Sequence, residues 1–294
     1  MGVETNFDMI AEGKIFPHID FARRIAKYRL AGSRFDGTYA DNKVLIVRDN
    51  NGNEKRLHWK VLKLNKFKLY TNKMDSLIFN RDPIIKVGDA NTTKLVLALI
   101  ERKRWLNGIR KAVRNMEKYG DAPIKTYRNG VSAFSPINAF KVVDENDREN
   151  VIAYVLVDYI KDNNNTITNI RFETHLKGYV YERVYEYNGS TLGKLVRYKY
   201  KDRVIPANGA TYETGVDEFM VQWLSCDVDE EGVYGQSPYE DFECLVHEAE
   251  RRQTLESKIL DAHSEPMLVV GIGFLRENEE TGKVEAFDIL GNIS

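Results

Sequence analysis

The pattern of apolar and polar residues divides the chain into a β-rich middle and a long charged helix near its C-terminal end. Residues 151–205 form four runs of strand-like residues, separated by Asn-rich or Gly-containing turns, which is typical of antiparallel strands. Residues 43–64 predict a further hairpin, because Asn51-Gly52 favours a tight type I′ turn. Residues 122–144 alternate around a second turn signal, Asn129-Gly130. These segments predict a sheet-rich domain.

Three segments before residue 120 predict helices. Residues 16–31 carry a partial apolar stripe with basic polar faces: Ile19, Ile25, Ala26 and Leu30 against Arg23, Arg24, Lys27 and Arg29. The second helix ends before Pro83, and five of its residues recur at helical spacing: Phe67, Tyr70, Met74, Leu77 and Ile78. In the third, Thr92 or Thr93 provides the cap and Gly120 closes the helix. Helices with antiparallel strands make the fold class α+β.

The most unusual helix is expected over residues 237–263. Ser237 is the N-cap, Pro238 takes the first helical position, and Glu240 completes a capping box. Pro266 sets the latest possible end, so the helix has about 25 residues and a length of about 38 Å. Its apolar positions are few, and residues 250–254 contain none of the large ones. We expect such a helix to have other copies of itself, or solvent, as neighbours.

Composition excludes several classes of protein. The 294 residues suffice for one large domain or two ordinary ones, and 43% of them are hydrophobic. The net charge of −1 gives no global bias toward nucleic acid or a membrane surface. No apolar run of 18 residues predicts a membrane span, and the N-terminus lacks the apolar region of a signal peptide. The two cysteines, Cys226 and Cys244, are interpreted as reduced thiols.

Two clusters have the residue types of a metal site. The acids of Asp227–Gly232 have the spacing of the start of a calcium-binding loop, but position 12 is Pro238 where a bidentate Glu is required. A solvated acidic loop is therefore favoured. Glu243 and His247 lie one helical turn apart, yet no third ligand accompanies them. A surface ion pair or a contact between subunits is favoured there, and no metal or cofactor is expected.

Two functional alternatives remain open from the residues themselves. The segment Lys94–Lys118 carries eight basic residues against two acids, so it is able to contact phosphate in a nucleic-acid-binding domain. A helix with one apolar and one solvated basic face is the simpler interpretation. Glu173 and His175 share one face of a strand and are a candidate acid/base pair of an enzyme. We favour the interpretation that these two residues are simply polar side chains on the solvent-facing side of the strand. The enzyme alternative could also be centred on the acidic loop instead of on this pair.

The order of three stretches resembles the tailed-bacteriophage portal protein family, in the branch of long-tailed phages of Gram-positive hosts. The first is "NKFKLYTNKMDSLIFNRDPIIKVG" and the second "RNMEKYGDAPIKTYRNG…SAFSPINAFKVVDENDRENVIAYV". The third, "GVYGQSPYEDFECLVHEAERRQTLESKILDAHSEPMLVVG", is similar to the family's cap, long helix and following strand. The resemblance covers residues 60 to 290 as an order of elements, and no single motif in it is diagnostic.

The resemblance implies a non-enzymatic ring, usually a dodecamer, at one capsid vertex. Such a head–tail connector passes double-stranded DNA during packaging and genome ejection, without sequence preference. It docks the terminase large subunit, the major capsid or scaffold protein and head-completion proteins, and no membrane. Residues 1–236 would form the wing, 237–263 the first stem helix, and 264–294 the start of the clip. Family members continue into a second stem helix, a tunnel loop and a crown, so we expect this chain to be a truncated piece. Its place would be the virion, and the host cytoplasm during assembly.

Within the stem helix, one face carries no Lys or Arg. Residues 243, 247, 250 and 254 fall at i, i+4, i+7 and i+11, which share a face. A conduit for DNA should present acids or neutral groups, because a basic wall would hold the phosphates tightly. We therefore expect the channel-facing residues to be Glu243, His247, Glu250 and Thr254. The basic residues Arg251, Arg252 and Lys258 are expected at contacts between subunits.

Overall fold

The computed structural model describes residues 7–39, 42–48, 54–81, 84–102, 105–127, 130–228, 233–264, 275–277 and 284–286. The helices are α1 (Ile19–Asp36), α2 (Lys66–Ile78), α3 (Ala90–Arg102), α4 (Trp105–Tyr119), α5 (Tyr239–Ser264) and a short 3₁₀ turn, η1 (Pro136–Asn138). The strands up to residue 195 are β1 (Asn42–Arg48), β2 (Glu54–Lys60), β3 (Asp121–Tyr127), β4 (Gly130–Ala133), β5 (Ala139–Val143), β6 (Val151–Lys161), β7 (Ile167–Leu176), β8 (Tyr179–Tyr187) and β9 (Leu192–Leu195). The later strands are β10 (Tyr198–Tyr200), β11 (Arg203–Ile205), β12 (Ala210–Glu213), β13 (Val221–Ser225), β14 (Leu275–Glu277) and β15 (Val284–Ala286).

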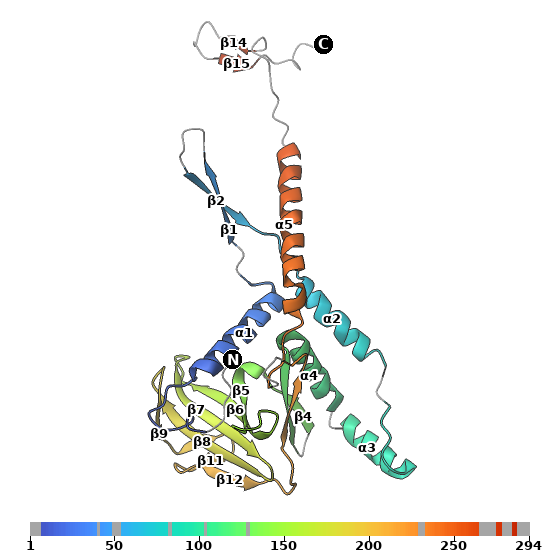
Figure 1. The fold of residues 1–294 in the computed structure, drawn as a ribbon, viewed down its shortest axis with the longest axis vertical. Coiled ribbons are helices and arrows are strands. Elements are labelled where there is room, and N and C mark those ends of the chain that lie inside the picture. Colours follow the sequence, from blue (N-terminus) through green and yellow to red (C-terminus); the bar gives the residue numbers. More distant parts are fainter. Residues whose placement is uncertain are drawn as a thin grey trace. The chain divides into compact units, whose positions relative to one another are not determined.

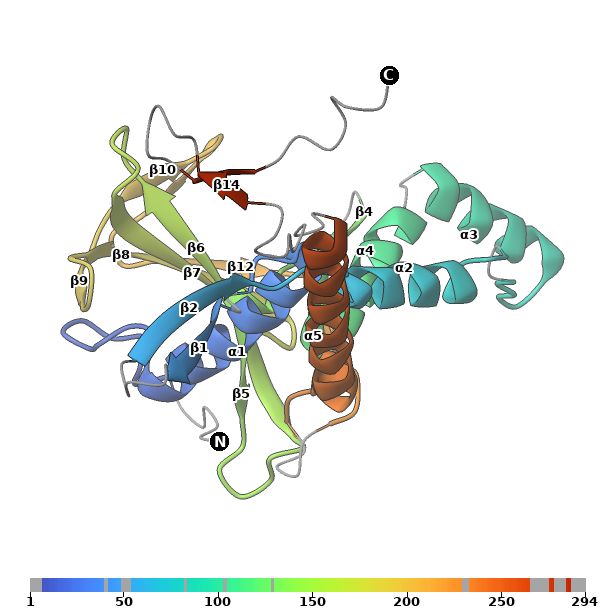
Figure 2. The ribbon, with the colours of Figure 1, turned by 90° about the horizontal axis from the view of Figure 1, so that it is seen from above.

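The fold is α+β, as the sequence pattern predicts. A six-stranded sheet has the order β12-β8-β7-β6-β5, with β9 also paired to β8 (Figures 1 and 2). The pairs along this sheet are antiparallel. A second sheet of three strands has the order β13-β3-β4 and is also antiparallel. The first three predicted strands between residues 151 and 205 are present as β6, β7 and β8, whereas the fourth, residues 194–205, is divided among the end of β9 and the short pair β10–β11.

The chain divides into two compact units. The first comprises residues 1–42 and 63–246, and the second comprises residues 43–62 and 247–294. The first contains both larger sheets and α1 to α4. The second contains the expected β1–β2 hairpin and most of α5. Helix α5 thus belongs to both units. The expected clip region lies outside the described residues except for the β14–β15 pair.

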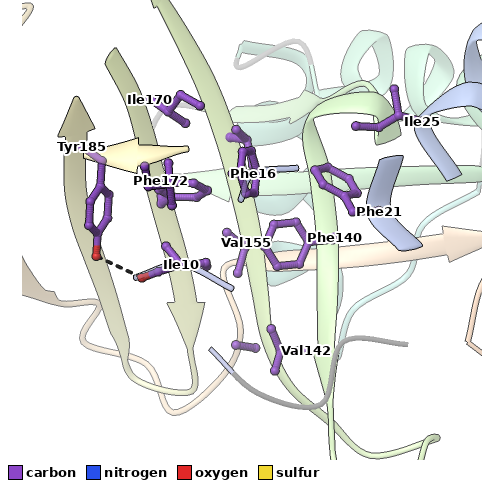
Figure 3. Packing of buried hydrophobic residues seen from close by; sticks show 13 residues of the cluster. Ile10, Phe16, Phe21, Ile25, Phe140, Val142, Val155, Ile170, Phe172 and Tyr185 are labelled. Carbon is purple, nitrogen blue, oxygen red and sulfur yellow. Dashed lines mark hydrogen bonds between the residues drawn. The ribbon is translucent and has the colours of Figure 1, made fainter. Parts of the chain in front are cut away.

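The main core of the first unit lies between the six-stranded sheet and α1. Phe16 contacts the Phe172 ring edge-on at 4.9 Å, and Phe21 of α1 lies 5.0 Å from Phe140 of β5 (Figure 3). The hydroxyl of Tyr185 donates to the Ile10 carbonyl at 3.0 Å. The N-terminal segment is therefore fixed on the sheet by both packing and a hydrogen bond.

The expected apolar stripe of α1 is confirmed at Ile25 and is wrong at Ile19, Ala26 and Leu30. Ile19 and Leu30 are exposed, whereas the buried positions include Phe21, Ile25 and Tyr28, which lie at i, i+4 and i+7. Arg24, expected on a polar face, is buried with its guanidinium 3.7 Å from the Tyr234 ring centre. The aromatic residues carry more apolar area than the residues in the expected stripe, so they select the inner face.

The second and third predicted helices also differ from expectation. In α2, Phe67, Thr71 and Asp75 are buried while Leu77 and Ile78 are exposed. The expected basic helix over residues 92–119 is described as the helical segments α3 and α4, and residues 103–104 between them lie outside the described residues. Among the described residues, no helix is both long and apolar enough to cross a membrane.

Candidate functional site

The start of α5 is fixed by a cap, as the sequence predicts. The Ser237 hydroxyl accepts from the backbone N–H of Tyr239 at 3.3 Å and donates to the Lys118 carbonyl at 2.9 Å. The N–H of Glu240 bonds to the Ser237 carbonyl at 3.0 Å. One side chain therefore satisfies a helix N–H and also ties α5 to the end of α4.

Two glycines bring the segment before α5 against the turn after α4. A Cβ atom on Gly235 would lie 2.1 Å from the Gly120 carbonyl oxygen and 2.5 Å from that of Cys226. Gly120 has a φ of +86°, which favours glycine, and its carbonyl accepts from the Cys226 N–H at 2.7 Å. No side chain fits between these backbones. The close approach fixes where the long helix begins.

Asp121 is a buried hydrogen-bond centre beside this approach. Its Oδ1 accepts from Trp223 Nε1 at 2.6 Å, Ser225 Oγ at 2.8 Å and the Gly235 N–H at 3.0 Å. Its Oδ2 accepts from the Tyr28 hydroxyl at 2.7 Å. One fully buried carboxylate thus connects α1, β13 and the segment that leads into α5.

Aromatic rings complete the support of the first turns of α5. The Phe67 ring lies 5.0 Å from Tyr239 and 5.5 Å from Phe242. The Tyr239 hydroxyl is 2.5 Å from Thr71 Oγ1, and burial raises the pKa of Tyr239 above its ordinary value. Val246 belongs to the same cluster. Helix α2 therefore holds one side of α5 from Tyr239 to Val246.

A buried carboxyl in this support gives a pH-dependent prediction. Burial raises the pKa of Glu117 above 4.5, although a Tyr70 hydrogen bond opposes the shift. Its Oε2 has no hydrogen-bond partner within the described part of the chain. Because the folded pKa is raised, the contribution of Glu117 to stability is complete below pH 4.5 and is lost as the pH rises through the folded value. Glu117→Gln should therefore raise the free energy of unfolding at pH 7.5 by about 1 kcal/mol, with little gain at pH 4.

Urea unfolding of Glu117→Gln at both pH values checks this, with Glu101→Gln on the exposed surface of α3 as the control. A gain of equal size at the two pH values would show that ionisation of Glu117 is not its source.

The four residues expected to face a channel lie on the inner side of α5. Glu243 forms an ion pair with the buried Arg34. Glu250 and Thr254 are buried, and Thr254 Oγ1 accepts from the Leu62 N–H at 3.0 Å. His247 Nδ1 lies 3.7 Å from Glu250 Oε2. A side chain that is buried inside its own chain does not reach a channel. Glu250 and Thr254 are therefore not part of the proposal below.

The outer side of α5 is where large apolar residues are exposed. Leu245, Ile259 and Leu260 are on this side, whereas Val246 is buried. Arg251 Nε and Arg252 Nε both bind Glu248, at 2.8 and 2.9 Å. These bonds, from Arg251 first, lower the pKa of Glu248 to about 2. Arg251 and Arg252 are thus exposed but neutralised within the helix, and Lys258 is also exposed.

A second candidate site is an ionic cluster on the face of the large sheet opposite α1. On β7, Ile170 and Phe172 face the apolar core, so Arg171, Glu173 and His175 point to the other face. The guanidinium of Arg171 binds Glu173 at 2.6 Å, Glu182 at 2.5 Å and also Asp158. Lys125 pairs with Glu173 and Arg203 with Glu182. A pocket of about 450 Å³ lies against the cluster, lined by residues that include Lys125, Arg171, Tyr200 and Arg203.

The favoured solvent-facing interpretation of Glu173 and His175 is wrong, because both are buried. His175 Nε2 lies 2.9 Å from Glu173 Oε1. Burial alone would raise the pKa of Glu173, but the His175 hydrogen bond and the charges of Lys125 and Arg171 outweigh it and lower the pKa. A carboxylate with a lowered pKa is a weak proton acceptor. The pair is therefore poorly suited to serve as the general base of an enzyme.

The basic helices do not present all of their charge as a surface for phosphate. Arg110 and Arg114 both bind the buried carboxylate of Asp75, at 2.7 and 2.9 Å. The hydrogen bonds from Arg110, which has the larger effect, and from Arg114 lower the pKa of Asp75, although burial acts to raise it. Arg110 and Arg114, two of the eight basic residues of the segment Lys94–Lys118, thus anchor α4 to α2.

No metal site accompanies these features. Within the residues that the structure describes, no group of three or more His, Cys, Asp and Glu side chains has the arrangement of a metal site. Of the acidic loop 227–232, only Asp227 and Val228 are described. Cys226 and Cys244 are free thiols, as expected.

The sequence predicts the Ser237 cap but not the other residues that fix α5. Gly120 was interpreted only as a helix end, and Asp121 and Gly235 had no role. The sequence signal for this approach is a glycine beside each helix end: Gly120 directly after α4 and Gly235 shortly before α5. Comparison with known proteins adds no further assignment: no family model and no curated protein matches this chain.

Proposed function

We propose that this chain is a subunit of a portal-like ring, a non-enzymatic assembly through which double-stranded DNA passes at a capsid vertex. The observation that carries the proposal is α5. This helix has 26 residues, seven acids against three bases, and large apolar side chains exposed on its outer side. A monomeric protein rarely leaves such a stripe uncovered, so it indicates a surface for association.

The anchoring of α5 supports the same proposal. Ser237, the Gly120–Gly235 approach and Asp121 fix the first turn rigidly on the first unit. A helix that is to line or brace a ring must keep its direction relative to the domain that carries it, since every subunit repeats the same contact. The buried hydrogen bonds of Asp121 at this point are consistent with that requirement, because such a network makes the junction rigid.

The charge of α5 suits a DNA conduit more than a DNA-binding surface. Its excess of acids repels phosphate weakly, and its exposed arginines are paired with Glu248. Duplex DNA carries about one charge per 1.7 Å of axis, so uncompensated basic residues along a channel would slow its passage.

The size of the assembly tests this proposal. Native mass spectrometry of the purified chain should give one closed oligomer of about twelve subunits, the number that the resemblance to portal proteins implies. A protein that stays monomeric at about 100 μM, or that forms a continuous ladder of sizes, would contradict a closed ring.

A further inference from the structure

Helix α2 exposes a stripe that is the counterpart of the one on α5. Leu69, Lys73 and Leu77 lie at i, i+4 and i+8 on one face of α2. Leu69 is 50% exposed and Leu77 is 72% exposed. Lys66 and Lys73 are exposed as well. The α2 stripe is therefore apolar at Leu69 and Leu77, with positive charge at Lys66 and Lys73.

The α5 stripe also has exposed apolar residues, with acids beside them, and its arginine on this face, Arg252, is bound to Glu248 at 2.9 Å. Leu245, Ile259 and Leu260 are 68%, 57% and 68% exposed. Asp241 and Glu256 are exposed beside them, and both lie within one helical turn of the apolar stripe. Two leucine-bearing stripes, one flanked by lysines and one by acids, are complementary in both polarity and charge.

The α2 stripe and Leu245 lie on the outer sides of the contact between α2 and the first turns of α5. Helix α2 holds α5 through Phe67 and Thr71, which contact Tyr239. Leu69, Lys73 and Leu77 each follow one of the buried residues Phe67, Thr71 and Asp75 by two positions. Two positions correspond to about 200° around a helix, so they lie on the other side of α2. On α5, Leu245 is exposed while its neighbour Val246 packs inward. The α2 stripe and Leu245 of the α5 stripe therefore do not cover one another within this contact.

We propose that the α2 stripe of one copy of this chain packs against the α5 stripe of the next copy. Two different surfaces that face away from each other make a head-to-tail contact, which closes into a ring when the rotation between copies allows it. The inference rests on the proposed ring and names the two surfaces that build it. Lys66 and Lys73 would face Asp241 and Glu256 across a contact formed by the leucines and Ile259.

Two variants that each destroy one surface test the contact. The first is Lys73→Glu with Leu77→Asp on α2, and the second is Leu245→Asp with Glu256→Lys on α5. The substituted side chains are all exposed, so the subunits should remain folded. The matched control is Lys27→Glu with Leu30→Asp on the exposed side of α1.

Each variant alone should be monomeric by analytical ultracentrifugation, while the control assembles as the unchanged chain does. An equimolar mixture of the two variants should give a one-to-one dimer and nothing larger, because the mixture retains one intact surface on each partner. A mixture that stays monomeric, or a variant that assembles alone, overturns the proposal. An unchanged chain that is monomeric at about 100 μM overturns it too.

The outcomes also separate this contact from the proposed function. If the unchanged chain forms closed rings and both variants still form them, the ring stands and these surfaces are not its contact. If the mixture gives the dimer but the unchanged chain forms open filaments, the contact stands and the portal-like ring does not.

Discussion

Replacing Asp121 with alanine is expected to lower the free energy of unfolding by about 3–5 kcal/mol, which is a large share of the stability of an ordinary domain. The fully buried carboxylate accepts hydrogen bonds from four donors: Tyr28 Oη, Trp223 Nε1, Ser225 Oγ and the Gly235 N–H. Alanine leaves these donors in the interior without their acceptor. Each unsatisfied buried donor costs about 1–3 kcal/mol, and local rearrangement recovers part of the sum.

Urea unfolding followed by tryptophan fluorescence measures this loss, because Trp223 is itself one of the donors. Asp147→Ala is the control, since Asp147 is exposed and its side chain accepts from the Glu149 N–H at 3.1 Å. A change below about 1 kcal/mol for Asp121→Ala would mean that the carboxylate does not hold this junction together.

The second large effect is expected for Arg171→Met in the ionic cluster. The variant should lose about 3–5 kcal/mol at pH 7, because Glu173 and Glu182 stay buried after their shared cation is removed. Burial opposes ionisation of Glu173, but the neighbouring donors and cations keep its folded pKa lowered. Its contribution to stability is therefore present above the unfolded pKa and lost as the pH falls through the folded pKa. In the variant the Glu173 carboxyl has lost one of the cations that keep its pKa low and can take up a proton more readily, so the loss should shrink at pH 4.

Two companion variants separate charge from packing. Arg171→Met with Glu182→Gln should recover part of the loss, since it removes one of the uncompensated charges. Arg183→Met changes an exposed arginine on the neighbouring strand and should stay within about 0.5 kcal/mol of the unchanged chain. If Arg171→Met costs the same at pH 4 and pH 7, the loss comes from packing and the electrostatic explanation fails.

The strands and the long helix were predictable because their signals are local. Alternating residues, Asn-Gly turns and the Ser237-Pro238 cap each specify backbone geometry within a few positions. The cap of α5 and the strands β6 to β8 accordingly agree with the sequence pattern.

Burial of polar residues was not predictable in the same way. Arg24, Arg171, Glu173 and Asp75 look like surface residues because charges usually are. Their partners come from distant positions: Arg110 meets Asp75 across 35 residues, and Lys125 meets Glu173 across 48. Similarly, the side of α5 that carries Glu243 faces inward because Glu243 forms an ion pair with the distant Arg34. Charge patterning within the helix alone gave the wrong side.

The central claim is that α5 and its support build a closed ring around a channel. Cryo-electron microscopy of the purified chain tests it most directly. The account predicts a ring with one rotation axis, in which α5 of every subunit lies next to the central opening and its outer side contacts α2 of the neighbouring subunit. Isolated monomers, two-fold dimers, or rings with α5 on the outer circumference would contradict it.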